Sequence, residues 1–479
     1  MIKQKYIKMK FEKIIKNFKY LLFNKNFNKI IYLFILLLIL FIPIKQIYDN
    51  KLNSNYLNIQ KNINLNFNKK LKKKIKIGLY CRSIKNGGIE RIVSMLLNYL
   101  DRLSIFNIYL FTKINKENNE YIIPKNITRI VVRNNIVKKV LKENIDILIY
   151  NLNNEDEIKI LNNLKKPKTI FYIHQCFLLW IYRKNYNKIN IYKAYKSAKY
   201  VISLVPFEND YLFKKWGICS ILMNNFISYN YKSVIPSNLS SKTILMIGRA
   251  TDSMKRFKLG IKVMKYIVKE IPESRMIIIS SIKKNSFIQY FTKKLKIEKN
   301  VKFVGYSSKP EIYFKNASLH IFPSICESFG LVVGETKMYG IPNILIGIDY
   351  ISIVKGGTVI IYDDNPEIIS KEAIKILKND KYRKKLGKEA RKSMIKINNT
   401  LIFTKWIKLI LSIYNGDKYY QRLREYDEKI SENSAVNILR NQLNLLKKRI
   451  KNFESITTQN LENFTFVQNL VNYMKPFIK

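Results

Sequence analysis

Short apolar runs alternate with amphipathic segments from residue 75 to about residue 415. The runs have the length and composition of buried strands, and the segments between them have helical spacing. This alternation is typical of βαβ units on a parallel sheet, so we predict an α/β fold. The predicted strands are Ile75–Tyr80, Asn107–Thr112, Thr128–Arg133, Ile145–Tyr150, Thr169–His174, Lys199–Leu204, Cys219–Met223, Thr243–Gly248, Arg275–Ser280, Val301–Gly305, Ser318–Pro323, Ile341–Ile346 and Gly357–Tyr362. The main predicted helices are Ile89–Leu100, Pro206–Trp216, Leu331–Tyr339, Pro366–Lys378, Lys381–Lys396 and Leu401–Tyr414.

One polar stretch interrupts this alternation and predicts a domain boundary. Asn224 begins it, and Pro236-Ser-Asn-Leu-Ser-Ser241 ends it. Polar segments rich in Pro and Ser commonly link domains. We therefore predict a first α/β half at 75–225, a linker at 226–241 and a second α/β half at 242–415. The last three predicted helices would close the second half.

The N-terminal residues have a different pattern, which predicts a membrane anchor. Residues 1–29 hold nine lysines and one acid, and their apolar residues fall on one helical face. Such a basic amphipathic helix suits an anionic membrane surface. Residues 30–45 contain fifteen uncharged residues before Lys45, slightly short of a spanning helix. A cleaved signal peptide is the alternative, but no small-residue cleavage site follows.

The lysines before the apolar segment favour a cytosolic N-terminus, with most of the chain across the membrane. Residues 46–74 are then a polar spacer. This predicts a single-pass membrane protein, in an endomembrane such as the Golgi or ER if the source is eukaryotic.

Residues 416–479 predict a helical tail. Val436, Leu439, Leu443, Leu446, Ile450 and Phe453 are spaced alternately by three and four residues. This spacing is typical of a coiled-coil seam. The seam would either form a homodimer or dock on the protein's own surface.

The formal charge of +53 raises nucleic acid as a partner. The lysines are spread along the chain rather than clustered, and no zinc-finger or RNA-binding signature accompanies them. We attribute the charge mainly to compositional bias and predict no nucleic-acid partner. The four cysteines, at 81, 176, 219 and 326, have no metal-type spacing, and we predict no metal site.

The stretch Ser324-Ile-Cys-Glu327-Ser-Phe-Gly330-Leu-Val-Val-Gly334-Glu335 offers the clearest chemistry. It joins a predicted strand to a predicted helix, where open α/β sheets bind ligands. A helix N-terminus attracts an anion such as a diphosphate, and carboxylates accept hydrogen bonds from hydroxyl groups. Glu327 and Glu335 are therefore candidates for binding a sugar nucleotide. Alternatively, both are ordinary surface acids.

Other candidates follow predicted strands elsewhere. Gly87 and Gly88 form a turn where backbone can approach a ligand. Arg249 and Lys255 follow a strand and could neutralise a diphosphate, or be plain solvated cations. His174 ends its strand at the functional edge of the sheet, where a site role and a core role are both open. His320 lies inside an apolar strand, so we expect a structural role.

Gly87-Gly-Ile-Glu-Arg91, His174, Gly248-Arg249 with Lys255, and Glu327-x7-Glu335 occur in the order found in family 4 retaining glycosyltransferases. The chain resembles that family over about residues 75–415. The resemblance implies the GT-B fold, with two Rossmann-like halves. It also implies a retaining, metal-independent transfer from a nucleoside-diphosphate sugar, with no other cofactor.

The resemblance also implies roles for the candidate residues. Arg249 and Lys255 would bind the donor diphosphate, Glu327 would face the transferred sugar, and Glu335 would bind the ribose hydroxyls. The backbone around Phe329, Gly330 and Leu331 would lie near the sugar and phosphates. Gly87 and Gly88 would approach the donor phosphate or the acceptor, and His174 would line the sugar site.

The sequence departs from the family pattern after Glu335. Tyr339 stands where a small residue is usual, and Asp349-Tyr-Ile-Ser lacks the frequent glycine pair. The donor's identity is therefore left open. The leading hypothesis is a membrane-anchored hexosyltransferase acting on a glycan or lipid-linked acceptor. The alternatives are a non-catalytic GT-B-like membrane scaffold, acting through its basic N-terminus and coiled-coil tail, and a nucleic-acid binder.

Overall fold

The computed structural model describes residues 73–85, 87–133, 135–151, 167–174, 200–282 and 286–416, with seven single residues: 176, 193, 195, 196, 198, 441 and 445. The chain divides into two units, residues 1–73 and residues 74–479, and both sheets described below belong to the second unit. The predicted anchor, the spacer up to residue 72 and the seam residues of the tail lie outside the described residues. Among the residues described, no helix combines the length and hydropathy needed to span a membrane.

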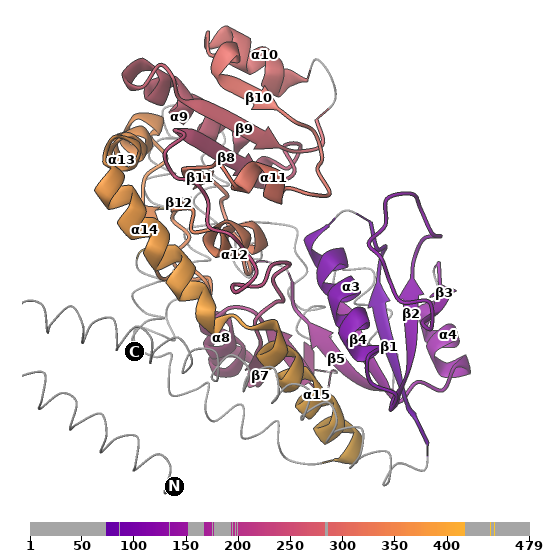
Figure 1. The fold of residues 1–479 in the computed structure, drawn as a ribbon. Helices are drawn as coiled ribbons and strands as arrows, with labels where there is room; N and C mark the ends of the chain where they lie inside the picture. The colour runs from indigo at the N-terminus through magenta and orange to yellow at the C-terminus, as the bar shows by residue number, and fades with distance from the viewer. Residues whose placement is uncertain are drawn as a thin grey trace, which may run out of the picture. The chain divides into compact units, whose positions relative to one another are not determined.

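The first half of the described chain forms a seven-stranded sheet whose paired strands are all parallel (Figure 1). Its order is β3-β2-β1-β4-β5-β6-β7, so the order reverses between β1 and β4. In such sheets, ligands bind beyond the strand ends at the reversal point. The strands are β1 (Ile75–Cys81), β2 (Phe106–Thr112), β3 (Thr128–Val131), β4 (Ile147–Asn151), β5 (Lys168–Tyr172), β6 (Tyr200–Ser203) and β7 (Ser220–Leu222).

The second half forms a six-stranded parallel sheet with the order β10-β9-β8-β11-β12-β13. The reversal lies between β8 and β11, which corresponds to β1 and β4 of the first sheet. Its strands are β8 (Thr243–Ile247), β9 (Arg275–Ile279), β10 (Val301–Phe303), β11 (Leu319–Phe322), β12 (Asn343–Ile346) and β13 (Thr358–Ile361). Each predicted strand is present, and its ends agree with the prediction to within two residues.

Helices join these strands, as the apolar spacing predicts. In the described part of the first half they are α3 (Gly88–Leu100), α4 (Ile136–Lys142) and α8 (Pro206–Trp216). In the second half, short 3-10 turns η1 (Ser253–Lys255), η2 (Glu298–Asn300) and η3 (Met394–Lys396) accompany the helices. The helices after β8 are α9 (Phe257–Glu270), α10 (Phe287–Lys294), α11 (Glu311–Phe314), α12 (Leu331–Met338), α13 (Pro366–Lys378), α14 (Asp380–Ser393) and α15 (Asn399–Asn415).

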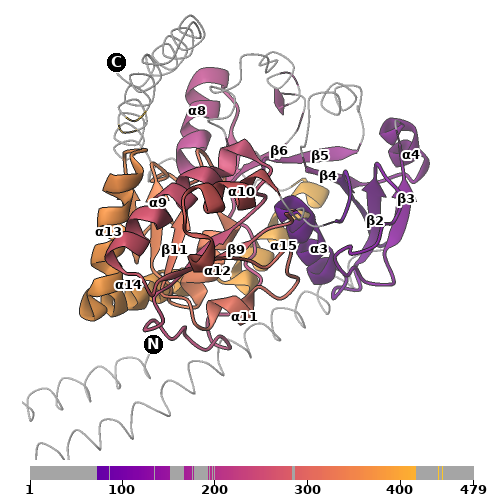
Figure 2. The ribbon, with the colours of Figure 1, turned by 90° about the horizontal axis from the view of Figure 1, so that it is seen from above.

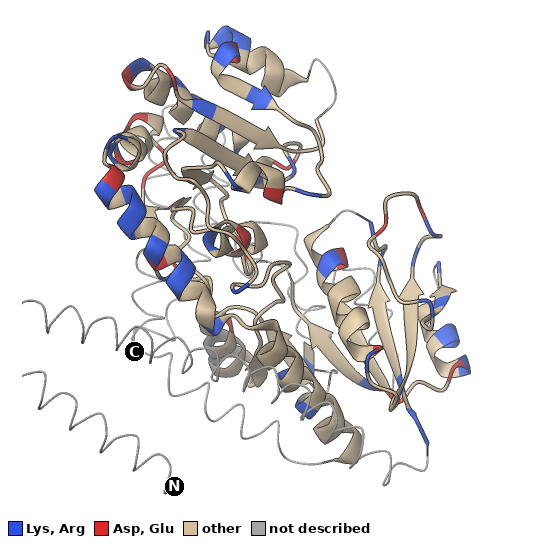
Figure 3. Ribbon diagram, in the orientation of Figure 1, with Lys and Arg blue, Asp and Glu red and all other residues tan. Residues whose placement is uncertain are grey.

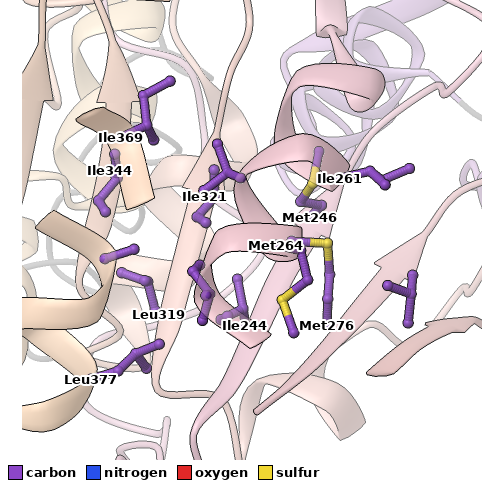
Figure 4. Packing of buried hydrophobic residues seen from close by; sticks show 14 of the residues in the cluster. Ile244, Met246, Ile261, Met264, Met276, Leu319, Ile321, Ile344, Ile369 and Leu377 are labelled. Carbon is purple, nitrogen blue, oxygen red and sulfur yellow. The ribbon is translucent and has the colours of Figure 1, made fainter. Parts of the chain in front are cut away.

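The core of the second half lies between its sheet and the helices α9 and α13 (Figure 4). Ile244 and Met246 of β8 are buried against Ile261 and Met264 of α9. Gly260 permits this packing, because a Cβ at that position would lie 2.3 Å from Sδ of Met246. Each fully buried aliphatic side chain of this kind contributes roughly 1.5–3 kcal/mol. This core fixes the strand ends that carry the candidate site.

The last described helix, α15, packs on the first half. From the sequence, we predict instead that it closes the second half. Phe403 stacks with Tyr99 of α3 at 4.9 Å, and Trp406 meets Tyr172 of β5 edge to face at 5.2 Å. Lys168 Nζ donates to the carbonyl of Ile413 at 2.6 Å. Figures 1 and 2 both show α15 beside α3. The apolar spacing of α15 showed that one face would be buried, but not against which sheet.

Basic side chains are distributed over both halves. Figure 3 shows Lys and Arg along α14 as well as on helices of the first half. The exposed lysines of α14 are Lys381, Lys384, Lys385, Lys388 and Lys392.

Candidate functional site

The Glu327–Glu335 segment lies at the reversal point of the second sheet. β11 ends at Phe322, a loop carries Glu327, and α12 begins after Gly330 and carries Glu335. Gly330 has φ 76°, a left-handed conformation that favours glycine. A Cβ there would also lie 3.0 Å from Cδ1 of Ile351. The glycine therefore sets both the turn and the start of the helix.

Glu327 is paired with a cation of its own half. Its carboxylate forms an ion pair with Nζ of Lys255, which lies in η1 beyond β8. Both side chains are mostly buried, at 13% and 22% exposure. Lys255 Nζ also lies 5.7 Å from the ring centre of Phe322. The structure thus brings together two predicted site residues that are far apart in the sequence.

Glu335 is paired with a cation of the other half. Nη2 of Arg91, in the first turn of α3, lies 2.7 Å from Oε1 of Glu335. Oγ of Ser228 also donates to Oε1, at 3.3 Å. Burial raises the pKa of Glu335 above its usual value, whereas Arg91 and Ser228 lower it. The buried carboxylate is therefore held by contacts from two separate parts of the chain.

The N-terminal ends of α3 and α12 adjoin each other. A Cβ on Gly88, the first residue of α3, would lie 3.3 Å from Cδ1 of Leu331, the first residue of α12. Each helix end carries a partial positive charge and backbone N–H groups without helical partners. The structure therefore places two anion-attracting helix ends next to each other, beside both Glu327 and Glu335.

Glu90 occupies the space over Gly87. A Cβ on Gly87 would lie 1.8 Å from Oε2 of Glu90, so a side chain at this position would require the Glu90 carboxylate to shift. Burial raises the pKa of Glu90 above its usual value, and Arg249 acts in the opposite direction. An anion at Gly87 would require the carboxylate of Glu90 to move or to bind a proton. The phosphate-binding role of Gly87 and Gly88 stays a prediction.

Arg249 is less involved in these contacts than Lys255. Its side chain is 74% exposed and lies 3.5 Å from Asp252. Arg249 interacts electrostatically with Glu90, which lies in the first turn of α3. Its predicted role in diphosphate binding is not tested by this geometry.

His174 follows β5 and contacts both halves. Nδ2 of Asn151 donates to the carbonyl of Tyr80, so Oδ1 of Asn151 accepts from Nε2 of His174 at 2.8 Å. Burial lowers the pKa of His174 to about 3, so the ring is neutral at physiological pH. The backbone carbonyl of His174 accepts a hydrogen bond from Oγ of Ser328 at 2.7 Å. The residue thus joins the first sheet to the Glu327 loop.

His320 has the structural role that we expect from its strand. It is fully buried in β11, with Nδ1 2.6 Å from Oδ1 of Asn343 on the neighbouring strand. Burial lowers the pKa of His320 to about 4, which keeps the ring neutral.

The loop after β12, where the sequence departs from the family pattern, supports the site directly. The backbone N–H of Glu327 donates to Oη of Tyr350 at 3.0 Å, and Oη lies 3.6 Å from Sγ of Cys176. Lys337, in α12, donates to the carbonyls of Ile353 at 2.5 Å and Lys355 at 2.8 Å. Side-chain contacts therefore hold this loop against the Glu327–Glu335 segment.

Tyr339 also has a packing role. Its ring meets those of Tyr229 and Phe314 edge to face, at 5.3 Å and 5.2 Å. Oη of Tyr229 donates to Glu311 at 3.0 Å. The large residue at 339 thus belongs to an aromatic cluster between the linker and α11, beside Glu335.

Several site residues were missed from the sequence. Arg91 could have been singled out, because it is the last residue of the Gly87–Arg91 motif. The sequence did not indicate that Glu335 is its partner. Ser228 and Tyr350 gave none, since isolated Ser and Tyr residues in loops are common. Among the described residues, no group of three or more His, Cys, Asp or Glu side chains is placed to hold a metal ion.

Comparison with known proteins finds a family match within the second part of the chain. Residues 230–393 match the family described as Glycosyl transferases group 1. The match contains Arg249, Lys255, Glu327 and Glu335. Poly(glycerol-phosphate) alpha-glucosyltransferase of Bacillus subtilis is 27% identical over 215 residues, which cover 43% of this chain and 30% of that protein. The chain therefore aligns with less than a third of this relative's length.

Solved structures share the architecture of both halves. S. aureus TarM, in a complex that contains UDP, has a TM-score of 0.58 and 14% identity, covering 72% of this chain and 100% of that chain. Sucrose-phosphate synthase of Thermosynechococcus elongatus has a TM-score of 0.58 and 16% identity, with the same coverage. Anabaena HepE, in complex with UDP and glucose, has a TM-score of 0.57 and 13% identity, covering 71% and 99%. At these identities the likeness shows the fold. The chain thus has the two-sheet GT-B fold, and its residues 230–393 match the Glycosyl transferases group 1 family.

Proposed function

We propose that this protein is a retaining glycosyltransferase that transfers a hexose from a nucleoside-diphosphate sugar to a glycan or lipid-linked acceptor. One observation carries the proposal: the Lys255–Glu327 and Arg91–Glu335 ion pairs flank the adjoining N-terminal ends of α3 and α12. A sugar nucleotide combines a diphosphate with hydroxyl-bearing groups on either side. Positive helix ends between two carboxylates match that chemistry.

The diphosphate, the transferred sugar and the ribose of the donor each have a suitable partner in this arrangement. Lys255, Arg249 and the start of α12 would neutralise the charge that develops on the departing diphosphate. Glu327, through the oxygen that Lys255 leaves available, would accept hydrogen bonds from the transferred sugar, and Glu335 from the ribose. With the diphosphate leaving on the same face that the acceptor enters, the configuration at the sugar carbon is retained. No protein nucleophile is assigned.

The finer parts of the proposal rest on the sequence and on the relatives. The B. subtilis relative is a glucosyltransferase named for a poly(glycerol-phosphate) acceptor. A hexose donor and a polymeric or lipid-linked acceptor are therefore the first to test. The basic residues 1–29 and the apolar residues 30–45 support a membrane anchor, which would place the enzyme near a lipid-linked acceptor. Metal independence is proposed because the chain itself supplies the positive charge near the diphosphate.

The first experiment is a thermal-shift panel on the full chain in detergent, with uridine, guanosine and adenosine diphosphate sugars. A bound donor raises the melting temperature, and the increase grows with the logarithm of the ratio of donor concentration to dissociation constant. We expect one nucleotide series to stabilise the protein. Stabilisation by none of them would favour the scaffold alternative.

The second experiment measures release of nucleoside diphosphate and transfer by two variants. We expect Lys255→Ala and Glu335→Ala to abolish both activities without unfolding the protein, because they remove groups that contact the donor. Lys265→Ala is the matched control, since this exposed lysine of α9 changes the net charge equally but lies outside the site. Full activity in both site variants would contradict the site assignment.

A further inference from the structure

Arg91 and Glu335 form a mostly buried ion pair between the two halves. Arg91 is 21% exposed and Glu335 is 3% exposed, with Nη2 and Oε1 separated by 2.7 Å. Arg91 belongs to the first turn of α3, and its backbone N–H donates to the carbonyl of Gly87. The position of its guanidinium is therefore fixed by the helix start that adjoins α12.

The contacts of Glu335 are unequal between its two oxygens. Oε1 accepts from both Arg91 and Ser228. Within the described part of the chain, no hydrogen bond to Oε2 is observed. A carboxylate oxygen can accept two hydrogen bonds, so Oε2 retains capacity for a ligand hydroxyl. Because Oε1 is held from two directions, the direction in which Oε2 points is set as well.

Burial and a second acid disfavour the charged form of Glu335. Glu311 of α11 raises the pKa of Glu335 by repulsion, in addition to the effect of burial. The hydroxyl groups of Tyr121, Tyr229 and Tyr339 also face it, and their pKa values are raised, so they remain neutral. Arg91 is the cation among these groups. Without Arg91, the carboxylate would bind a proton at a higher pH.

We propose that Arg91 is a positioning residue for nucleotide binding: it keeps Glu335 ionised and oriented so that Oε2 accepts a ribose hydroxyl of the donor. This inference rests on the proposed function. It makes the donor site, whose other predicted residues lie mostly in the second half, depend on a side chain of the first half. It therefore assigns a specific role to Arg91 in the Gly87–Arg91 stretch.

The Arg91–Glu335 ion pair could also oppose donor binding, and the experiment distinguishes this inhibitory role from a positioning role. If the donor had to break the Arg91–Glu335 contact in order to bind, removal of Arg91 would raise donor affinity. If Arg91 positions Glu335, its removal lowers affinity and weakens the preference for a ribose hydroxyl. The sign of the change therefore decides between a positioning contact and an inhibitory one.

The test is calorimetric titration of the full chain in detergent with UDP, 2′-deoxy-UDP and 3′-deoxy-UDP. We expect the natural protein to bind UDP at least about tenfold more tightly than one of the deoxy forms, as for a lost charge-assisted hydrogen bond. In Arg91→Met this preference should shrink to about threefold or less, with a weaker affinity for UDP. Arg275→Met is the matched control, because Arg275 is exposed at the start of β9, outside the site.

A double-mutant comparison shows whether Arg91 acts through Glu335. We expect Arg91→Met to have little further effect on ribose preference once Glu335→Gln is present, because the two changes remove one shared contact. Both nucleotides carry the same diphosphate, so its protonation affects both affinities equally and does not change the ratio of UDP affinity to deoxy-UDP affinity. That ratio should fall with decreasing pH, and in Arg91→Met it should fall at a higher pH than in the natural protein.

Failure of the inference and failure of the proposed function give different results. Unchanged ribose preference in Arg91→Met, or tighter binding of UDP, would overturn the inference while leaving the proposed function in place. Failure of the natural protein to bind any nucleotide or nucleotide sugar would overturn the proposed function itself. If Arg91→Met does not fold, Arg91→Gln, which removes the charge and keeps a donor, gives the same comparison. Ser228→Ala tests the second contact to Oε1 and should reduce the preference less.

Discussion

The two halves of the molecule contribute to the candidate site in different ways. In the second half, Arg249 and Lys255 follow β8, and Glu327 and Glu335 follow the neighbouring strand β11. All four residues lie within one family match. The first half contributes single groups that reach across: the guanidinium of Arg91 and the backbone carbonyl of His174. The second half thus carries a recognisable motif, whereas the first half completes it through isolated contacts.

This difference separates the two acids of the Glu327–Glu335 segment. Glu327 takes its charge partner from its own half, and Glu335 takes its partner from the other. A change at Glu327 should therefore report on chemistry within the second half. A change at Glu335 should report on nucleotide binding that both halves share.

The largest expected effect tests this separation directly. We expect Glu327→Gln to reduce transfer about 100-fold while UDP affinity stays within about twofold, because its carboxylate would face the sugar rather than the nucleotide. Glu335→Gln should instead weaken UDP binding about tenfold. Steady-state transfer assays and UDP titration measure the two effects. Glu298→Gln, at an exposed acid outside the site, is the control. Equal loss of UDP affinity in both variants would remove the distinction between the acids.

The next effect concerns His174, the first half's link to the Glu327 loop. The pKa of His174 is about 3 in the folded protein, against about 6.5 when unfolded. The unfolded chain therefore binds the additional proton between these values, so stability is fully present above pH 6.5 and falls as the pH decreases toward 3. Protonation of His174 in the unfolded chain should lower the free energy of unfolding by about 2 kcal/mol between pH 7 and pH 5.

We expect His174→Gln to remove that share of the pH dependence, as measured by chemical unfolding at pH 7 and pH 5. His320, whose pKa is about 4, should retain a similar share in the variant. An unchanged pH dependence in His174→Gln would mean that the histidine is charged in the folded protein.

The smallest expected effect concerns Tyr350, which supports Glu327 from within the second half. Tyr350→Phe removes the hydroxyl that accepts the N–H of Glu327, at a cost of about 1 kcal/mol. We expect kcat to fall about fivefold, with little change in UDP affinity. Tyr290→Phe, at a residue 64% exposed on α10, is the matched control. No change in kcat would show that the loop is held by its other contacts.

The site illustrates how far sequence reasoning reaches. The spacing of Glu327 and Glu335 around Gly330 predicted a strand, a turn and a helix, because a left-handed glycine and apolar periodicity are local properties. Lys255 was predicted beside a strand end, and the parallel order of β8 and β11 places it against Glu327. The contacts of Ser228 and Tyr350 could not be predicted, since their partners are far away in the chain and neither residue type is unusual in a loop.

The sequence by itself determined the element order and the second-half motif. Each of these is encoded by residues close together in the chain. Only the tertiary structure decided that α15 packs on the first half and that Arg91 is the partner of Glu335. An amphipathic face or a lone arginine specifies that a partner is needed, whereas packing between distant elements selects it.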